Sequence, residues 1–473
     1  MLRPQFLRVP FGTRSLATRA LGYSLGVPGT DARVHVGTTG LVLEAPNSGV
    51  TQPFVFDYVW LRDACRSPES VHPSTQQKLF HTTDVPIAAP GDCLLSETEE
   101  PVRIGGTPDA PELLVEYSPR HAVINEFTRT ISPDAVQKPS GPHTARIPVS
   151  LLLDHAVSER YIASHCDVIG MAEPWDAGSL QGNGRPLSIT WGEVQTPDGL
   201  LSLLTAALRD GFAFVTELPT EKTSSERGAD AATLRELATT IGTLRHTFYG
   251  TLWDVQSIAE SRNIAYTNLD LGFHMDLLYF QNPPRFQLLH MLRKTVTGGQ
   301  NLFVDSLKVA EHMWTYHREE WEALADTPVA YHYVNAGERY YYTHPVFERA
   351  APAEGHAGGP LRGDMPRLAA VNYSPPFQAP LPLQSSLRDA TKRELFLRGL
   401  NRFARLTHDR SMIFERALEP GECVLFDNRR VLHSRTGFEW NDSTHGHIGR
   451  WLKGAYVEGD SVWSRFRALR HKK

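Results

Sequence analysis

The C-terminal half of the chain is dominated by short apolar runs separated by turn residues, a pattern typical of β-strands. Helices are expected near residues 306–325 and 384–408. A doubly wound fold would alternate strands with helices, so this pattern favours two packed antiparallel sheets. We predict a mainly β protein with flanking helices, whose main domain is a double-stranded β-helix, or jelly roll. The strand candidates are RFQLLHML, QNLFVDS, VAYHYV, RLAAVNYS, ECVLFDN and HIGRWLKGAYVE.

The length of 473 residues predicts more than one domain, because single cores rarely grow beyond ~250–300 residues. Residues 33–140 carry short apolar runs bounded by Gly, Pro and Asn, which predicts a small β-rich N-terminal domain. Residues 141–190 have helix-like apolar spacing and are expected to form a helical connection. Residues 191–473 then form the jelly-roll domain, which opens with an amphipathic helix ending at Gly211.

The first 30 residues have the composition of a mitochondrial transit peptide. Arg3, Arg8, Arg14 and Arg19 are interspersed with Ser and Thr, and the first acidic residue is Asp31. A basic tail without a targeting function would instead leave the protein cytoplasmic. The four cysteines form no CxxC pair, which fits a reducing compartment.

Charge and hydropathy exclude two classes of partner. The net charge is -5, and Lys and Arg are scattered instead of forming a basic stripe, so we expect no nucleic acid to bind. No stretch approaches the ~20 consecutive apolar residues that span a bilayer, so we expect no membrane association.

Two histidines and a carboxylate form a candidate metal site. Residues two apart in a strand point the same way, so His274 and Asp276 in GFHMDLLYF would face one interior, and Met275 would face the other side without an assigned role. His433 in DNRRVLHSR supplies the second imidazole. Two histidines and one carboxylate bind one face of iron(II) and leave positions open for a co-substrate and dioxygen. Alternatively, the HxD triplet is a chance occurrence, since such triplets are common.

Longer motifs decide between these alternatives. Together they resemble the gamma-butyrobetaine dioxygenases, within the taurine dioxygenase-like family of Fe(II)- and 2-oxoglutarate-dependent oxygenases. This resemblance covers residues 35–473 in scattered blocks. It implies that His274, Asp276 and His433 bind Fe(II), that 2-oxoglutarate is the co-substrate, that ascorbate serves as reductant, and that the protein is a homodimer. The motifs are WLRDACRSPES, FYGTLWDVQ, NIAYTNLDLGFHMDLLYFQNPPRFQLLH, TVTGGQNLFVDS, FDNRRVLHSRTGFE and RWLKGAYVEGDSVWSRFRALR.

The resemblance also assigns residues to the co-substrate. Arg450 matches the family arginine that pairs with the distal carboxylate of 2-oxoglutarate, which a planar guanidinium can bind through two parallel hydrogen bonds. The alternative for Arg450 is a surface salt bridge. Asn301 stands where relatives often place a threonine or serine near the co-substrate. The stretch EWNDSTHGH between His433 and Arg450 is longer than the usual connection.

Four aromatic residues match the family's cage for a trimethylammonium group: Tyr249, Trp253, Tyr266 and Tyr456. Ring faces carry negative potential, so they suit a quaternary ammonium, which cannot donate hydrogen bonds. The alternative is ordinary core packing. Asn263 also matches and could bind the substrate carboxylate, whereas the expected asparagine in VNYSPPFQAP is replaced by Ser374, with Asn372 nearby.

A structural zinc site of the relatives is incomplete in this chain. Cys65 and His143 match its ligands, but Ser67 and Ser70 occupy the positions of two cysteines. Two ligands do not complete a tetrahedral zinc site. We therefore predict that this zinc is absent and that packing or a polar cluster replaces it.

The resemblance implies hydroxylation of the small-molecule quaternary ammonium gamma-butyrobetaine to L-carnitine, with 2-oxoglutarate converted to succinate and CO2. One alternative is a trimethyllysine dioxygenase, whose substrate carries an extra α-amino group that needs an acceptor. Another is a non-catalytic betaine-binding protein, because fold alone does not imply activity.

Overall fold

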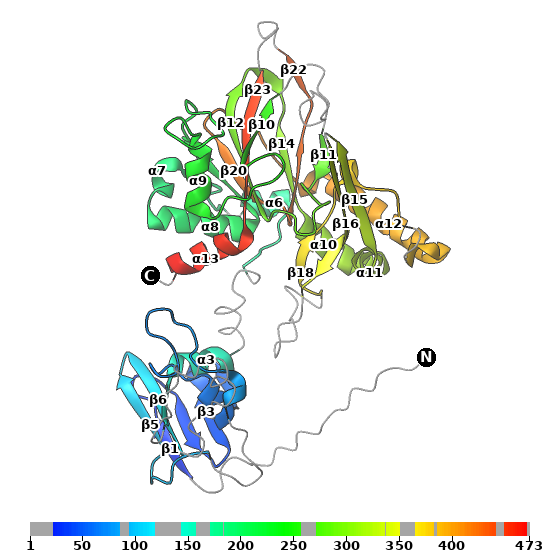
Figure 1. The fold of residues 1–473 in the computed structure, drawn as a ribbon. Helices are drawn as coiled ribbons and strands as arrows, with labels where there is room; N and C mark the ends of the chain where they lie inside the picture. Colours follow the sequence, from blue (N-terminus) through cyan, green and yellow to red (C-terminus); the bar gives the residue numbers. More distant parts are fainter. Residues whose placement is uncertain are drawn as a thin grey trace. The chain divides into compact units, whose positions relative to one another are not determined.

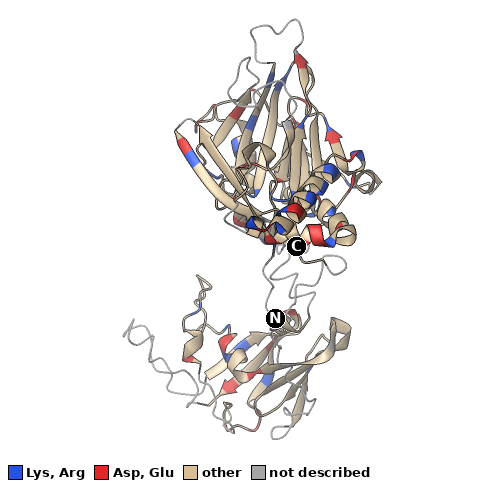
Figure 2. Ribbon diagram, turned by 90° about the vertical axis from the view of Figure 1, so that its right-hand side faces the viewer, with Lys and Arg blue, Asp and Glu red and all other residues tan. Residues whose placement is uncertain are grey.

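The computed structural model describes residues 22–85, 94–118, 143–157, 171–182, 184–256, 271–335, 337–350, 365–382, 386–440 and 449–470. The chain divides into two compact units, Met1–Asp167 and Val168–Lys473 (Figure 1). Lys and Arg are interspersed with Asp and Glu within both units (Figure 2). None of the described helices is both long and apolar enough to cross a bilayer.

The N-terminal unit contains two antiparallel sheets, with strand orders β1-β2-β3-β4 and β5-β6-β7. Leu43, Leu113 and Ile147 are buried in the core that both sheets share. The strands are β1 (Tyr23–Gly26), β2 (Arg33–Val36), β3 (Gly40–Ala45), β4 (Val50–Asp57), β5 (Val102–Thr107), β6 (Ala110–Tyr117) and β7 (His143–Pro148). The helices are α1 (Tyr58–Asp63) and α3 (Val149–Ala156), with short 3-10 helices η1 (Pro46–Ser48) and η2 (Thr82–Asp84).

Strand β7 falls within residues 141–190, where we expected a helical connection. It pairs with β6 along its whole length, and its alternate residues His143, Ala145 and Ile147 are buried. This two-residue periodicity is that of a strand with one face on a core. The described residues 143–157 therefore belong to the N-terminal unit. The expectation of a helical connection was wrong for His143–Pro148, whereas Val149–Ala156 does form a helix, α3.

The C-terminal unit is a jelly roll, as predicted. Its major sheet has the order β10-β23-β12-β20-β9-β8 and its minor sheet the order β11-β21-β14-β19, and every pair except β8–β9 is antiparallel. Phe212 of the major sheet stacks on Phe303 of the minor sheet with ring centroids 5.4 Å apart, so apolar side chains fill the space between the sheets.

The strands of this unit are β8 (Ser188–Thr190), β9 (Phe212–Thr216), β10 (Leu252–Gln256), β11 (Leu271–His274), β12 (Phe286–Lys294), β13 (Val296–Gly298), β14 (Asn301–Asp305), β15 (Pro328–Asn335), β16 (Glu338–Pro345), β17 (Phe347–Arg349), β18 (Leu368–Val371), β19 (Ile413–Arg416), β20 (Cys423–Asp427), β21 (Val431–Arg435), β22 (Phe438–Trp440) and β23 (Arg450–Val457). The helices are α6 (Ala177–Gly182), α7 (Trp191–Val194), α8 (Pro197–Asp210), α9 (Thr233–Ile241), α10 (Ser306–Tyr316), α11 (Arg318–Asp326), α12 (Ala390–Thr407) and α13 (Gly459–Arg470), with short 3-10 helices η5 (Pro375–Phe377), η6 (Ser386–Arg388) and η7 (Arg410–Met412).

Helix α8 has clear start and stop signals. The Thr196 hydroxyl accepts a hydrogen bond from the backbone N–H of Gly199, and Pro197 occupies the first turn. Gly211 ends the helix with φ +82°, a left-handed conformation that glycine adopts without steric cost. The helix buries Leu203 and Leu204 in the core beneath the major sheet, which leaves the opposite face of that sheet for the jelly-roll interior.

Candidate metal centre and cavity

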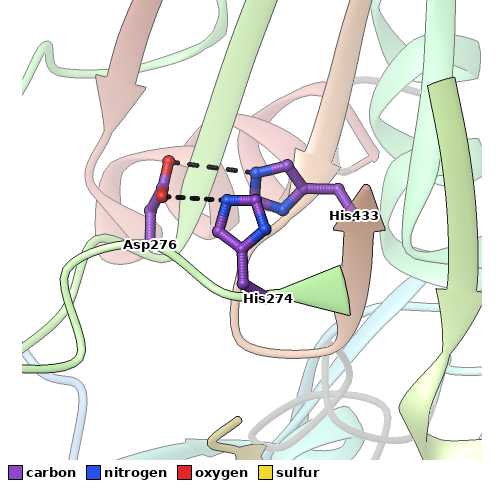
Figure 3. Close-up of side chains that lie close together, drawn as sticks. All are labelled: His274, Asp276 and His433. Carbon is purple, nitrogen blue, oxygen red and sulfur yellow. Dashed lines mark ion pairs between the residues drawn. The ribbon is translucent and has the colours of Figure 1, made fainter. Parts of the chain in front are cut away.

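His274 and His433 are direct partners in the antiparallel ladder between β11 and β21. Their ring centroids lie 4.2 Å apart. The Nε2 atom of His274 lies 3.5 Å from Oδ1 of Asp276, and Nε2 of His433 lies 3.9 Å from Oδ2 of the same carboxylate (Figure 3). One ligand atom from each residue lies within 4.8 Å of the other two. The structure therefore brings together the three residues that we proposed as metal ligands.

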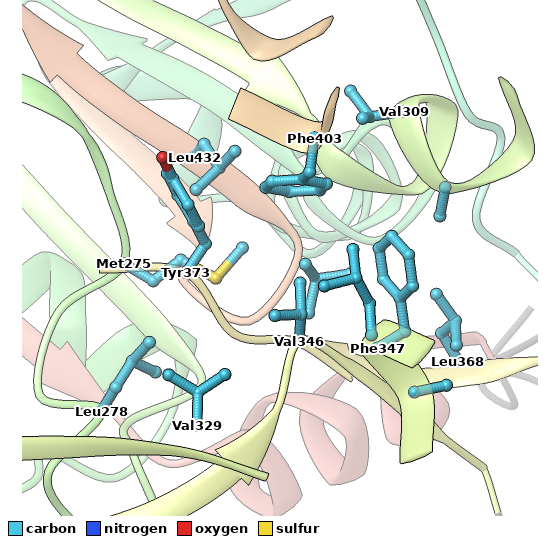
Figure 4. Close-up of a cluster of buried hydrophobic side chains, with 14 of the residues drawn as sticks. Met275, Leu278, Val309, Val329, Val346, Phe347, Leu368, Tyr373, Phe403 and Leu432 are labelled. Carbon is cyan, nitrogen blue, oxygen red and sulfur yellow. The ribbon is translucent and has the colours of Figure 1, made fainter. Parts of the chain in front are cut away.

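The prediction that one strand carries the whole HxD triplet was wrong. Strand β11 ends at His274, and Leu277 has a positive φ of 60°. Asp276 thus lies on the turn that follows the strand, and this turn directs its carboxylate back toward His274 (Figure 3). Met275 is fully buried in an apolar cluster that includes Leu278 and Tyr373 (Figure 4). Its side chain therefore anchors the turn in the core.

The protonation states suit a divalent cation. The Nδ1 atom of His274 lies 2.9 Å from the carbonyl oxygen of Gly272, so a proton on Nδ1 leaves the Nε2 lone pair facing the centre. Burial, reinforced by neighbouring His274, lowers the pKa of His433 to about 3, so this imidazole is neutral at physiological pH. Burial alone would raise the pKa of Asp276, but the facing His274 and His433 and the hydrogen bond from Gln287 lower it below its ordinary value, so this group is a carboxylate. The three residues thus offer two imidazole nitrogens and one carboxylate to a metal ion.

Two further side chains hold the Asp276 carboxylate. Gln287 Nε2 donates a hydrogen bond to Asp276 Oδ2 over 2.9 Å, and the Tyr456 hydroxyl donates to the same oxygen over 3.0 Å. Burial and the charge of Asp276 raise the pKa of Tyr456, so its hydroxyl keeps the proton that it donates. Because both bonds use Oδ2, the oxygen Oδ1 beside His274 is left for a metal. Outer partners of this kind orient ligands and increase metal affinity.

A cavity opens beside the three proposed ligands, and Arg450 and Asn301 line it as expected. Arg450 is 3% exposed, and no acidic side chain in the described parts of the chain pairs with it. Burial, followed by repulsion from Arg435, lowers the pKa of Arg450 to about 9. The Oδ1 atom of Asn301 is buried without a hydrogen-bond partner among the described residues. A buried cation of this kind fits an anionic ligand, such as a carboxylate.

Aromatic side chains also line the cavity. Trp253 stacks on Tyr456 with ring centroids 4.1 Å apart, and Tyr249 lies 6.5 Å from Trp253. All three line the cavity, as do Tyr279 and Phe377, which we did not anticipate from the sequence. Tyr279 follows Asp276 by only three residues, so its place near the metal ligands could have been predicted from the sequence. The expected contributors Asn263 and Tyr266 lie outside the described residues.

Ser374 and Asn372 are buried but do not line this cavity. Asn372 Nδ2 donates hydrogen bonds to the carbonyl oxygen of Pro345 over 2.8 Å and to Glu348 over 3.3 Å. The structure thus gives Asn372 a role in packing β18 against β17, and it does not bring either residue to the cavity wall.

In the N-terminal unit, Cys65, Ser67, Ser70 and His143 form a buried polar cluster. Cys65 Sγ lies 3.5 Å from His143 Nε2 and 3.3 Å from Ser67 Oγ, and Ser67 Oγ donates to Ser70 Oγ over 3.2 Å. Arg62 Nη1 donates to Ser70 Oγ over 3.2 Å, which places a guanidinium beside the cluster. A positive charge there would oppose the binding of a metal cation, and the absence of zinc stays a prediction.

Comparison with known proteins identifies the family. Residues 183–456 match the model described as "Taurine catabolism dioxygenase TauD, TfdA family". The chain belongs to this family. It is an Fe(II)- and 2-oxoglutarate-dependent dioxygenase, related to gamma-butyrobetaine and trimethyllysine dioxygenases.

Three relatives show the range of similarity. Dioxygenase str8 of Strobilurus tenacellus is 37% identical over 419 residues, covering 88% of this chain and 85% of that protein. Gamma-butyrobetaine dioxygenase of Pseudomonas sp. (strain AK-1) is 28% identical, covering 88% and 90%. Mitochondrial trimethyllysine dioxygenase of Rattus norvegicus is 27% identical, covering 88% and 82%.

The residues present fit the family's metal and co-substrate. His274, Asp276 and His433 would hold Fe(II), and the buried, positively charged Arg450 would bind a carboxylate of 2-oxoglutarate. When bound, the metal supplies oxidation of an unactivated C–H bond with dioxygen. The chain itself contributes the orientation of Asp276 through Gln287, and the aromatic side chains that line the cavity.

Proposed function

We propose that this enzyme hydroxylates gamma-butyrobetaine to L-carnitine, with conversion of 2-oxoglutarate to succinate and CO2. The observation that carries this proposal is the arrangement of the cavity, in which Tyr249, Trp253 and Tyr456 form a wall beside the metal ligands. Aromatic faces attract a quaternary ammonium without hydrogen bonds. A substrate held by its trimethylammonium group would therefore present its carbon chain to the metal.

The charges in the cavity favour gamma-butyrobetaine over trimethyllysine. Among the described residues that line it, Asp276 is the only acidic one, and its Oδ2 already accepts two hydrogen bonds. Trimethyllysine would bring an additional α-ammonium group, whose burial without an acceptor is unfavourable. Trimethyllysine is the second candidate substrate, because trimethyllysine dioxygenases are among the relatives of this chain.

The test is turnover by the full-length chain. Fe(II)-loaded enzyme is incubated with 2-oxoglutarate, ascorbate and either gamma-butyrobetaine or trimethyllysine, and succinate and the hydroxylated product are both quantified. We expect product from gamma-butyrobetaine and none with Asp276→Ala, whose fold is checked by circular dichroism. Turnover of trimethyllysine alone would overturn the proposal.

A carbon isostere of the substrate separates charge from shape. Replacing the trimethylammonium nitrogen of gamma-butyrobetaine by carbon gives an uncharged group of nearly the same size. If Tyr249, Trp253 and Tyr456 act through their ring potential, this analogue should bind at least ~10-fold more weakly, because a desolvated cation–π contact contributes about 2 kcal/mol. Equal binding of the two compounds would show that the wall selects by shape alone.

We further propose that the protein acts in mitochondria. The basic, Ser- and Thr-containing first 30 residues motivate this proposal, and a mitochondrial relative from Rattus norvegicus supports it. Fluorescence microscopy of the full chain fused to a C-terminal reporter, with and without residues 1–30, tests it.

A further inference from the structure

Asn428 lies in the short connection between β20 and β21 and is completely buried. The oxygen and the nitrogen of its side-chain amide both form hydrogen bonds to the backbone of Asp276. Oδ1 accepts a hydrogen bond from the backbone N–H of Asp276 over 2.8 Å, and Nδ2 donates to the backbone carbonyl of Asp276 over 3.0 Å. Nδ2 also donates to the carbonyl of Pro284 over 3.1 Å. One side chain therefore satisfies both backbone polar groups of the metal-binding aspartate.

The backbone at Asp276 needs this support because the sheet no longer provides it. Strand β11 has ended at His274, so Asp276 has no ladder partner. The next residue, Leu277, has φ +60°, a conformation that costs a non-glycine residue about 1–3 kcal/mol and persists only where surrounding contacts impose it. Before Asp276, the N–H of Met275 donates to the carbonyl of Tyr373 over 2.9 Å. The turn is thus fixed by contacts from outside its own segment.

Asn428 also connects two metal ligands. It precedes His433 by five residues, at the start of the connection that leads from β20 of the major sheet into β21 of the minor sheet. His433 pairs with His274 across the β11–β21 ladder, whereas the described hydrogen bonds of the Asp276 backbone reach the β20–β21 connection only through Asn428. We propose that Asn428 is a positioning residue that sets the distance between Asp276 and the two histidines and thereby determines metal affinity. This proposal rests on the assignment of His274, Asp276 and His433 as the metal ligands.

Metal binding to the full chain tests this role without any turnover. Mn(II), which binds the same kinds of ligand, is titrated anaerobically into the wild type and into Asn428→Ala, and the dissociation constants are measured by calorimetry. Loss of a partner that orients a ligand typically reduces metal affinity 10–100-fold, so we expect a loss of about that size. The control is Thr407→Val, which removes a buried hydroxyl that donates to the carbonyl of Ala404 over 2.8 Å and does not line the cavity. It should lower the unfolding temperature while leaving Mn(II) affinity unchanged.

A second variant decides the question if Asn428→Ala does not fold. Asn428→Asp has the same shape and can still accept the N–H of Asp276, but it has lost both donors. Its added negative charge would attract a cation, so a weaker Mn(II) affinity in this variant would report lost geometry. Folded variants that bind Mn(II) within twofold of the wild type would overturn the proposal. If Asp276→Ala bound Mn(II) normally, the ligand assignment itself would be wrong, and that result is distinct from a failure of the Asn428 proposal.

Discussion

Arg450 should limit the stability of the ligand-free enzyme, and Arg450→Met tests this. The guanidinium is 3% exposed, its charged neighbour is Arg435, and no acidic partner is present among the described residues. Each tenfold change in proton affinity corresponds to about 1.4 kcal/mol. A pKa of about 9 in place of 12.5 therefore corresponds to an unfavourable contribution of ~5 kcal/mol at neutral pH.

The increase in the free energy of unfolding caused by Arg450→Met should be smaller than ~5 kcal/mol. Replacing buried charges by apolar side chains of similar length stabilises proteins by about 1–4 kcal/mol, because relaxation already reduces the cost of the charge. We expect the free energy of unfolding to rise by about 2 kcal/mol. For a unit of this size each kcal/mol corresponds to roughly 2–4 °C, so the unfolding temperature should rise by roughly 5 °C.

The same substitution should abolish stabilisation by the co-substrate. At a concentration 100-fold above its Kd, a ligand stabilises the folded state by about 2.7 kcal/mol. Scanning calorimetry of the Mn(II)-loaded full chain, with and without 2-oxoglutarate, should show this gain for the wild type but not for Arg450→Met. Arg450→Lys keeps the charge but lacks the planar fork, so it should lose most of the gain without becoming more stable. A ligand-free Arg450→Met protein that is less stable than the wild type, or one that 2-oxoglutarate still stabilises, would refute the reasoning.

Three other predictions concern the aromatic wall and the N-terminal cluster. Trp253→Leu should raise the KM for the trimethylammonium substrate about tenfold, because it removes one cation–π contact of about 1–2 kcal/mol, while Mn(II) affinity measured by calorimetry stays unchanged. Purified protein should contain no stoichiometric zinc by mass spectrometry, and one equivalent bound through Cys65 would contradict this. Burial, followed by the charge of Arg62, lowers the pKa of His143 to about 4, so the unfolded chain binds the extra proton between pH 6.5 and 4. Stability should therefore fall by about 3 kcal/mol as the pH drops through that window, and His143→Gln should flatten this part of a denaturation-versus-pH curve.

The strands that frame the site were predictable because they are buried on both faces. The runs RFQLLHML, ECVLFDN and RWLKGAYV correspond to β12, β20 and β23, which lie beside one another in the major sheet. Their apolar side chains contact helices on one face and the jelly-roll interior on the other. Burial of this kind leaves a continuous apolar run in the sequence, whatever the tertiary partners are.

The end of β11 was not predictable in the same way. GFHMD has the residues of a continuing strand, but β11 ends at His274. The backbone of Asp276 is instead hydrogen-bonded to Asn428, which follows Asp276 by 152 residues in the chain. The strand propensity of a local sequence does not depend on a contact so distant in the chain, so it could not predict this end of the strand. The role of Gln287 could have been predicted from the sequence, because it is a polar residue within an apolar run. Buried polar side chains in such strands are usually hydrogen-bonded, and Gln287 bonds Asp276.

Tyr456 links the chemistry of the site to its specificity. Its ring stacks on Trp253 in the aromatic wall, and its hydroxyl donates to Asp276 Oδ2. A change at Tyr456 therefore alters the metal ligand and the substrate wall together, so a loss of turnover there cannot be assigned to either. Trp253 belongs to the aromatic wall and makes no described hydrogen bond to Asp276. Gln287 donates a hydrogen bond to Asp276 and is not aromatic. Comparing Trp253→Leu with Gln287→Leu consequently separates substrate recognition from metal positioning, since the first should change KM alone and the second should change Mn(II) affinity.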